Sequence, residues 1–332
     1  MRVQQGKVSR RLVAVVVTRN RLQSLQKTLG VLLAAPVGEL AGVVVVNNAS
    51  DDGTRAWLDG VQDARLDVLH LAQNTGGAGG FAAGMARALV AHAPDWLVLM
   101  DDDAWPEAGA LAAFHAQAEE AADAIAAAVY YPDGAICSMN RPARNPFRSL
   151  PAFVRFLRAK PGAAQLADAE FAAPASVDWA TFVGLFLRAE TVRAHGLPDA
   201  RLFLYADDVL YTLGLTRSGK SLQFRPDIRF IHDCTSLVDG TPNRLHPLWK
   251  TYFYHRNQLI LYRALAGWAF WPLAPLFIAK WALRARYHRD VRGRFWRLFG
   301  LGVWDGLRGC LTRDPLAIIA RDEAENGGRN GV

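Results

Sequence analysis

The chain has 332 residues, which is enough for one large domain or two smaller ones with a sizeable buried core. Because 51% of the residues are apolar and only 21% are charged, a disordered chain is excluded. The three cysteines, Cys137, Cys234 and Cys310, lie far apart in the sequence and form no C-x-x-C pair. This spacing argues against a disulfide framework and against a thiolate zinc site, and it fits a reducing compartment.

The predicted elements alternate strands with helices up to about residue 135, which favours a mainly parallel sheet with crossover helices. A loop-rich insertion is expected over residues 141–175, which are rich in Pro, Arg and Ala. The predicted helices are Leu22–Leu33, Phe81–Ala91, and two that begin near Ala189 and at Asp207. The predicted strands are Leu12–Val17, Gly42–Val46, Leu66–Leu71, Trp96–Met100, Ala124–Tyr130, Phe182–Leu187, Leu202–Leu204 and Ile228–Ile231.

Positive charge is concentrated near the C-terminus. Residues 241–313 contain 13 Lys and Arg against two acidic residues, whereas residues 1–240 contain 23 against 25. Six of the ten tryptophans lie in the same basic stretch. We therefore predict a nearly neutral domain over residues 1–240 and a basic, Trp-rich helical region over residues 241–332.

The longest uncharged run in this basic region is Ala264–Ala279. It is shorter than the roughly 20 residues that span a bilayer, and we expect Pro272 and Pro275 to break it. Interleaved Trp and Arg are typical of a segment lying in an anionic membrane interface. The alternative is a helical subdomain packed on the core with a solvated basic face. Nucleic acid is disfavoured as a partner, because no recognised nucleic-acid motif accompanies the basic charge.

Three consecutive carboxylates, Asp101–Asp103, directly follow the apolar run Trp96–Met100. Open α/β sheets bind ligands at the carboxyl ends of their strands, and adjacent carboxylates repel one another unless a cation offsets their charge. If the chain stays extended, Asp101 and Asp103 can face one ion, which predicts a hard divalent metal. The structural alternative is a solvated turn, in which Asp103 caps the next helix.

Polar and glycine-rich segments follow the second and third predicted strands. Residues Asn47–Thr54 can read a base or ribose by hydrogen bonds, although they also suit an ordinary turn and helix N-cap. Residues Asn74–Phe81 can bring backbone N–H groups to a phosphate or ribose at a helix start. A dinucleotide fingerprint would follow the first strand, where Thr18–Arg21 stand instead, so NAD binding is disfavoured.

A second acidic pair, Asp207 and Asp208, opens a predicted helix. The helix dipole favours an acid at this position, and a second carboxylate facing a polar pocket is a candidate general base. His232 follows the strand Ile228–Ile231, where a single histidine is more often structural than a metal ligand.

Taken in order, these motifs resemble the family 2 glycosyltransferases of the GT-A fold, over roughly residues 10–235. The run Asn74–Gly80 together with Met100–Asp103 is most similar to bacterial galactofuranosyl- and rhamnosyltransferases that act on cell-surface glycolipids. The resemblance implies an α/β fold with a mainly parallel sheet flanked by helices, followed in this chain by a C-terminal helical segment.

The resemblance also implies roles for individual residues. It assigns Asp101, Asp103 and His232 to a Mn²⁺ or Mg²⁺ site, where the nitrogen ligand favours Mn²⁺. It assigns the acceptor-side base to Asp208, with Asp207 beside it. We expect the acceptor near Trp179 and Phe182. The implied nucleotide-sugar ligands are Thr18, Arg19, Asn48, Asn74, Gly77 and Asp102.

Two motifs of related enzymes are missing. Galactofuranosyl polymerases carry paired tryptophans where this chain has Thr181-Phe182, and the Gln-x-x-Arg-Trp motif of processive synthases is absent. We therefore expect one sugar, or very few, to be added to each acceptor. The implied donor is a UDP or dTDP sugar carrying a galactofuranose- or rhamnose-like group, and the implied acceptor is a hydroxyl of a glycan or polyprenyl-linked glycolipid.

The implied mechanism is a single inverting displacement, in which Asp208 accepts the acceptor proton and the metal ion offsets charge on the departing nucleoside diphosphate. The basic region would hold the enzyme at the cytoplasmic face of the membrane. Two alternatives remain open: a non-catalytic membrane- or partner-binding module on a glycosyltransferase scaffold, and a sugar nucleotidyltransferase. A sugar nucleotidyltransferase would be expected to carry a Gly-rich loop with a basic residue after the first strand, and this chain lacks one.

Overall fold

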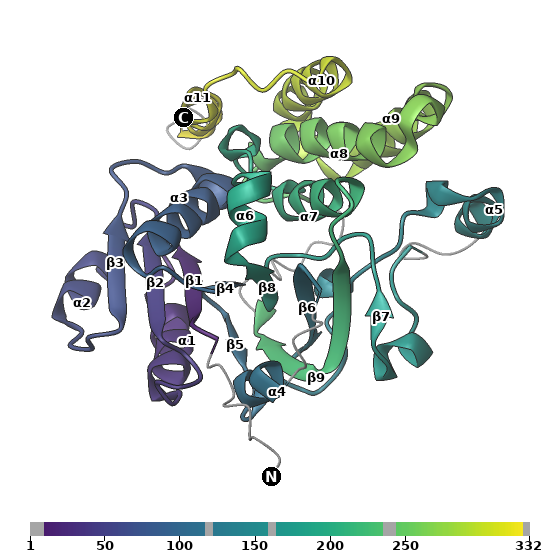
Figure 1. Ribbon diagram of the computed structural model, residues 1–332. Coiled ribbons are helices and arrows are strands. Elements are labelled where there is room, and N and C mark those ends of the chain that lie inside the picture. The colour runs from purple at the N-terminus through teal and green to yellow at the C-terminus, as the bar shows by residue number, and fades with distance from the viewer. Residues whose placement is uncertain (1–9, 117–121, 159–163, 235–243, 328–332) are drawn as a thin grey trace, which may run out of the picture.

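The computed structural model describes residues 10–116, 122–158, 164–234 and 244–327 (Figure 1). Residues 159–163 of the predicted insertion and residues 241–243 and 328–332 of the predicted C-terminal region lie outside the described residues. The remainder forms one mixed sheet with helices on both faces, and a group of C-terminal helices at one end of the molecule.

The N-terminal half of the sheet is parallel, as its alternating pattern predicts. Four strands lie in the order β3-β2-β1-β4, with a helix crossing over after each of the first three. The strands are β1 (Leu12–Thr18), β2 (Gly42–Asn47), β3 (Leu66–His70) and β4 (Trp96–Asp101), and the helices are α1 (Leu22–Ala34), α2 (Thr54–Gly60) and α3 (Gly76–Ala91).

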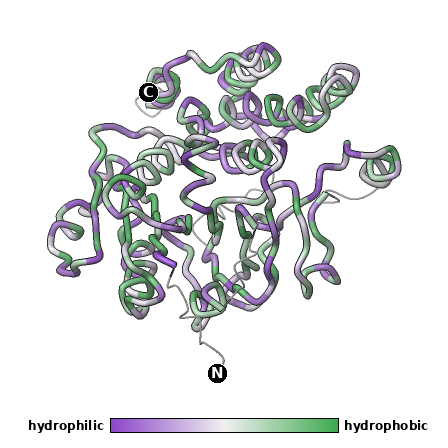
Figure 2. Tube along the Cα trace, in the orientation of Figure 1, coloured by the Kyte–Doolittle hydropathy of each residue, from purple (hydrophilic) through white to green (hydrophobic). Residues whose placement is uncertain are grey.

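Both faces of β1, β2 and β4 are buried, which explains the nearly continuous apolar sequence of these strands. Figure 2 shows hydrophobic residues along β1 and β2. Alternate residues of β1 belong to two different hydrophobic cores. Ala14 and Val16 pack toward α1, whereas Val13 and Val15 pack toward α3. The two cores fix the carboxyl ends of the strands at one edge.

The second half of the sheet is not parallel throughout. Four of the eight strand pairings are antiparallel. Strand β8 (Leu185–Arg188) lies between β4 and β6 (Ala124–Tyr130), and β9 (Leu222–His232) pairs with β6 on the other side. The remaining elements here are β5 (Ala104–Pro106), β7 (Ala175–Ser176), α4 (Ala110–Ala116), α6 (Ala189–His195) and α7 (Asp207–Arg217).

Two predicted strands differ from the structure. The predicted strand Phe182–Leu187 begins only at Leu185, because Gly184 adopts a left-handed conformation with φ +65°. The predicted strand Leu202–Leu204 is wrong: a 3-10 turn, Ala200–Leu202, is followed by Phe203 at φ +65°. Leucines in this segment face the core from a tight loop, which a short apolar run cannot distinguish from a strand.

The expected insertion contains short helices joined by loops. They are η2 (Pro146–Arg148), α5 (Leu150–Arg158) and η3 (Asp168–Ala172). Helix α5 was not predicted, because the segment is rich in Pro, Arg and Ala, although this helix is amphipathic.

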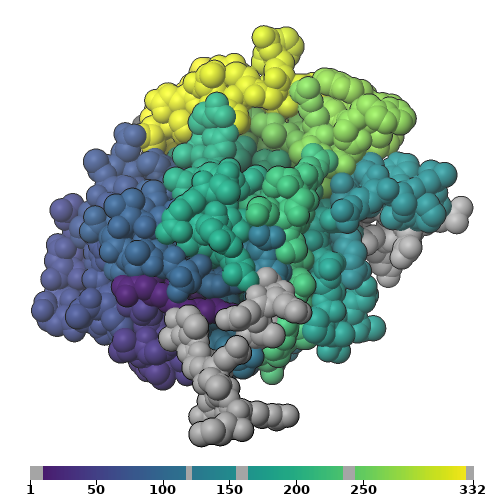
Figure 3. All heavy atoms as spheres, in the orientation of Figure 1, coloured from purple at the N-terminus to yellow at the C-terminus, as the bar shows by residue number. Residues whose placement is uncertain are grey.

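The C-terminal helices form a continuous cap at the end of the molecule next to α6 and α7 (Figure 3). They are α8 (Lys250–Ala266), α9 (Phe270–Ala282), α10 (Arg292–Arg308) and α11 (Pro315–Gly327). Helix α10 crosses α8 at two glycines: a Cβ at Gly302 would lie 2.6 Å from the Tyr252 carbonyl oxygen, and one at Gly306 would lie 2.8 Å from that of Arg256. Only glycine permits this close backbone contact.

The expected break at Pro272 and Pro275 is wrong. Helix α9 continues through both prolines, and the interruption lies at Gly267, where φ is +59°. Pro272 falls in the first turn, where its missing N–H has no helical partner to lose. Helices α8 and α9, together with the 3-10 turns that flank α9, form one helical stretch, Lys250–Tyr287. By length and composition alone, this stretch is long and apolar enough to cross a membrane.

Helix α8 anchors the loop that precedes α7. Asn257 is fully buried, and its side-chain amide donates to the carbonyls of Leu202, Leu204 and Tyr205 at 2.8 to 3.0 Å. Arg256, also fully buried, donates to the carbonyl of Leu202 at 2.7 Å. The loop contains three non-glycine residues with positive φ, a strained backbone that these bonds stabilise.

Asn257→Ala should lower the free energy of unfolding by about 2 to 4 kcal/mol, because it leaves buried carbonyl groups without donors. Gln258→Ala, one residue further along the same helix, is the matched control and should change stability by less than about 1 kcal/mol. Urea denaturation of both variants measures the difference. Equal effects of the two substitutions would show that α8 does not stabilise the loop through Asn257.

Candidate active site

The acidic triplet and His232 meet at the edge of the sheet. Strand β4 ends at Asp101, and β5 pairs with β9 so that Ala104 lies opposite His232. This register places His232 Nε2 3.1 Å from Asp103 Oδ1. One ligand atom from each of Asp101, Asp103 and His232 lies within 4.8 Å of the others. The three residues predicted as a metal site are therefore brought together.

A cavity of about 360 Å³ opens at this edge, and its walls bring together two groups of acids. Asp101 and Asp103 line it with His232, while Asp207 and Asp208 line it from the start of α7. Gly77 and Phe182, predicted to contact the donor sugar and the acceptor, also line it. Its volume lies within the range of small-ligand sites.

Arg21 offsets part of the negative charge. Its guanidinium lies 2.5 Å from Asp103 Oδ2 and 3.3 Å from Asp102 Oδ1. Although burial acts in the opposite direction, the hydrogen bond and charge of His232, with the charge of Arg21, hold the pKa of Asp103 below its usual value. Burial raises the pKa of Asp102 to about 7, against the opposing effect of Arg21. Asp103 is therefore the more strongly ionised of the two.

His232 is tied to carboxylates on one side and to uncharged groups on the other. Burial favours its neutral form, but hydrogen bonds with Asp103 and Cys137 and the charge of Asp101 raise its pKa to about 10. Its Nδ1 lies 2.7 Å from Asn140 Oδ1, which orients the ring with Nε2 toward the carboxylates.

The donor set fits a divalent cation. Two carboxylates and an imidazole nitrogen are ordinary ligands of Mn²⁺, and a cation would relieve the repulsion between Asp101 and Asp103. Burial raises the pKa of Asp101, and the charge of Asp103 raises it further. A cation at this point would favour the ionised form of both acids.

The second acidic pair has the protonation behaviour of a general base. Burial raises the pKa of Asp208 to about 6, although the Val209 N–H donates to its Oδ1 at 2.7 Å. Burial, and then the charge of Asp208, raises the pKa of Asp207 well above its usual value. Asp208 is the more exposed of the two, so it is the acid that a bound molecule could reach more readily. A carboxylate with a pKa near 6 is a better proton acceptor than an ordinary aspartate at neutral pH.

Most of the predicted nucleotide ligands lie behind or beside the cavity rather than in its lining. Buried Thr18 donates to Asp102 Oδ2 at 2.7 Å, and neither residue lines the cavity. Asn48 is also buried, and it holds the Thr75–Gly76 turn by donating to the Gly76 carbonyl at 2.9 Å and accepting from the Thr75 N–H at 2.9 Å. Arg19 donates to two carbonyls of the neighbouring loop. A nucleotide-binding role for these residues stays a prediction.

Two further predicted residues lie elsewhere. Asn74 accepts from the Gly76 N–H at 2.9 Å and lines a separate cavity of about 440 Å³ beside Arg313. Trp179, predicted near the acceptor, is partly buried against an apolar cluster that includes Leu213 and Leu261. Among the residues that the structure describes, Trp179 lies outside the cavity of the acids.

The cavity is also lined by Arg21, Asn140 and Lys250, which were not predicted as site residues. Cys137, which lies beside His232, was not predicted either. Arg21 belongs to the segment after β1, and pairing of this basic side chain with the acidic triplet could have been predicted. Asn140 and Cys137 come from a loop of irregular sequence, and Lys250 comes from α8, so no local pattern connects them with the triplet.

Comparison with known proteins points to a family of glycosyltransferases. The glycosyl transferase family 2 profile matches residues 13–173. Galactofuranosyltransferase GlfT1 of Mycobacterium tuberculosis is 32% identical over 253 residues, covering 74% of this chain and 80% of that protein. Undecaprenyl-phosphate mannosyltransferase of Micrococcus luteus is 38% identical over 96 residues, covering 28% of this chain and 38% of that protein.

Among solved structures, GalNAc-T7 with UDP, GalNAc and Mn²⁺ superposes with a TM-score of 0.54 at 15% identity, over 76% of this chain and 51% of that chain. This likeness supports the GT-A fold. The sequence match to the mycobacterial enzyme extends over most of both chains. This chain is therefore a glycosyltransferase and belongs to family 2.

Proposed function

We propose that this enzyme transfers a single sugar, galactofuranose-like or rhamnose-like, from a UDP or dTDP sugar to a hydroxyl of a glycan or polyprenyl-linked acceptor, with inversion and with Mn²⁺ or Mg²⁺. The main support is the cavity that has Asp101, Asp103 and His232 on one wall and Asp208 on another. The similarity to a galactofuranosyltransferase favours the sugar and a role in cell-surface polysaccharide synthesis.

In this proposal, Asp101, Asp103 and His232 hold the metal ion. When bound, the ion supplies positive charge that stabilises the departing nucleoside diphosphate. Arg21 keeps Asp103 ionised, and Asp102 and the loops held by Thr18 and Asn48 shape the nucleotide side. Gly77, at the start of α3, presents its backbone to the donor where helical N–H groups have no helical partner.

Asp208 acts as the general base. It accepts the proton of the acceptor hydroxyl while that oxygen forms a bond to the anomeric carbon, and the bond from that carbon to the diphosphate oxygen breaks. Asp207 stays protonated beside it, because burial and the charge of Asp208 raise its pKa well above the usual value, so Asp208 is the acid of the pair that ionises. Attack from the face opposite the leaving group inverts the anomeric configuration.

We further propose that α9 and its flanking turns lie on the cytoplasmic face of the membrane. Their exposed side chains include Trp268 (84% exposed), Leu276 (66%) and Leu283 (65%). Helix α8 is not available to lipid, because Arg256 and Asn257 are buried against the loop before α7. Helix α9 alone, with 13 residues, is about 20 Å long, which is less than a bilayer's hydrocarbon thickness.

Asp208→Asn should lower the transfer rate by about 100-fold or more while raising the melting temperature at pH 8. The folded-state pKa of Asp208 lies near 6, above the ordinary value of 3.8. Between these two values the unfolded chain ionises while the folded protein stays protonated, so the wild type loses stability as the pH rises to 6. The gain in stability should therefore grow from pH 4 to pH 6 and then level off. Calorimetry across this range measures it.

The control for this substitution is Glu323→Gln at an exposed position of α11. It should leave the rate unchanged and give no such pH-dependent gain. Full activity in Asp208→Asn would assign the base elsewhere.

Transfer itself is tested by the products formed with UDP-galactofuranose or dTDP-rhamnose and a synthetic polyprenyl-linked glycan. We expect free nucleoside diphosphate and a product of inverted anomeric configuration by NMR. Removal of divalent metal by a chelator should abolish turnover, and Mn²⁺ should restore it. Release of pyrophosphate would instead indicate nucleotidyl transfer, and retention of configuration would contradict the single displacement.

Membrane association is tested by flotation with phosphatidylglycerol vesicles. The double variant Trp268→Asp and Leu276→Asp should lose most of the bound fraction, because it places charge on the apolar surface of this segment. Val90→Asp is the control, since Val90 is equally exposed (86%) but lies on α3. If the double variant floats as well as the wild type, α9 is not the membrane contact.

A further inference from the structure

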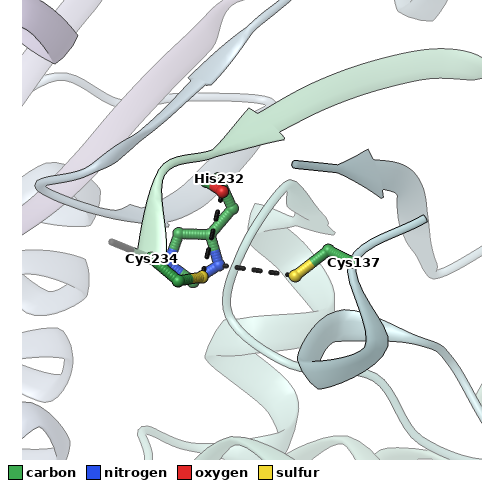
Figure 4. Close-up of side chains that lie close together, drawn as sticks. All are labelled: Cys137, His232 and Cys234. Carbon is green, nitrogen blue, oxygen red and sulfur yellow. Dashed lines mark hydrogen bonds between the residues drawn. The ribbon is translucent and has the colours of Figure 1, made fainter. Parts of the chain in front are cut away.

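A second cluster of metal-ligating side chains lies on the other side of His232. Cys137 and Cys234 are both buried free cysteines, and their sulfur atoms lie within 4.8 Å of each other and of a His232 ring nitrogen. Figure 4 shows the Cys137 thiol directed at the ring from the loop before η1 (Ser138–Asn140), with Cys234 coming from the chain just after β9. The sequence argued against a thiolate site because the cysteines lie far apart in the chain, but the fold brings two of them to the same histidine.

The distance between Cys137 and His232 is close to that in a tetrahedral zinc site. Typical Zn–S and Zn–N bonds place a thiolate sulfur about 3.6 Å from an imidazole nitrogen. Here Cys137 Sγ lies 4.0 Å from His232 Nδ1. Asn140 Oδ1, 3.0 Å from Cys137 Sγ and 2.7 Å from His232 Nδ1, stands where a fourth, oxygen ligand could bind.

We propose that Cys137, Cys234 and His232 Nδ1 form a binding site for Zn²⁺ or a similarly soft divalent ion, separate from the carboxylate site at Asp101 and Asp103. Two sulfurs and one nitrogen are soft ligands, whereas the carboxylates favour harder ions such as Mn²⁺. On binding, both cysteines ligate as thiolates and His232 loses its Nδ1 proton, with the released protons passing to solvent, so that two thiolates balance the charge of one divalent ion. A neutral assembly of this kind is suited to a buried position.

Occupation of this site should oppose metal binding at the carboxylate site. A neutral imidazole has one nitrogen lone pair, so His232 can ligate through Nδ1 or through Nε2 but not both. With Nδ1 bound to the soft ion, the ring proton resides on Nε2, where it donates to Asp103, 3.1 Å away. His232 is then no longer a ligand for the ion between Asp101 and Asp103. Zinc therefore acts as an inhibitor through the ring that the two sites share.

Binding is tested on the full-length, reduced protein with Co²⁺ as a spectroscopic probe for Zn²⁺. We expect a thiolate-to-cobalt charge-transfer band and intense tetrahedral d–d bands that saturate at one equivalent and disappear when Zn²⁺ is added. Cys137→Ser and Cys234→Ser should each weaken cobalt binding at least about tenfold. Cys310→Ser is the matched control and should leave the spectrum unchanged, because Cys310 lies in the distant loop after α10.

The absence of a thiolate band in the wild-type protein would overturn the proposal, as would a band that survives in both the Cys137 and the Cys234 variants. If these variants fold poorly, mass-spectrometric mapping of alkylated cysteines in the wild-type protein still tests whether the thiol site binds zinc. Zinc should protect Cys137 and Cys234 but not Cys310. Equal labelling of all three cysteines with and without zinc would contradict the site.

Competition is tested by the electron paramagnetic resonance signal of free Mn²⁺. One equivalent of Zn²⁺ should weaken Mn²⁺ binding at least about tenfold in the wild type and have no effect in the double variant Cys137→Ser and Cys234→Ser. Unchanged Mn²⁺ binding in the presence of zinc would refute the shared-ring mechanism. The competition between the two sites rests on the proposed function. A protein that binds no Mn²⁺ even without zinc would refute the carboxylate site, while the cobalt spectrum would still test the thiol site.

Discussion

Five carboxylates at one edge of the sheet are the constraint on which the rest of this structure depends. Asp101, Asp102 and Asp103 follow β4, and Asp207 and Asp208 begin α7. Burial alone would protonate such a group, because removing water penalises negative charge. Arg21 and His232 oppose this effect on the sheet side, so that Asp103 stays ionised. The uneven distribution of cationic partners gives each acid its own protonation state.

The same distribution separates the chemical roles around the cavity. On the sheet side, the carboxylates of Asp101 and Asp103 and an imidazole form a set suited to a cation, and Asp103 is already ionised. On the side of α7, burial without a nearby salt bridge among the described residues keeps the pKa of Asp208 near 6, in the range useful for proton transfer. Hydrogen bonds of Asn257 and Arg256 hold the loop that precedes this acid.

The sequence predicted the parts of the fold that arise from local pattern. Strands β1, β2 and β4 were foreseeable because residues buried on two faces form short apolar runs, and the Asp triplet was foreseeable because it directly follows one of them. The order of motifs also pointed to the family. By contrast, the antiparallel pairings of β8 and the strained loop before α7 depend on tertiary contacts. Such contacts leave no periodic pattern of apolar residues in a single sequence.

The long-range contacts that no motif marks were the least predictable. Cys137 and His232 lie 95 residues apart, and only the pairing of β9 with β5 and β6 brings them together. Trp179, which was expected near the acceptor, packs in an apolar cluster with residues of α7 and α8. Lys250 reaches the cavity from the C-terminal region, so that region contributes to the site as well as to the proposed membrane surface.

The central claim, a nucleotide-diphosphate site completed by a metal ion on Asp101, is tested most directly by calorimetric titration of UDP and dTDP with and without Mn²⁺. The account predicts that Mn²⁺ tightens binding of one of these nucleotides at least about tenfold in the wild type, and that Asp101→Asn removes this metal dependence. Equal affinity with and without Mn²⁺, or the same metal dependence in the variant, would contradict it.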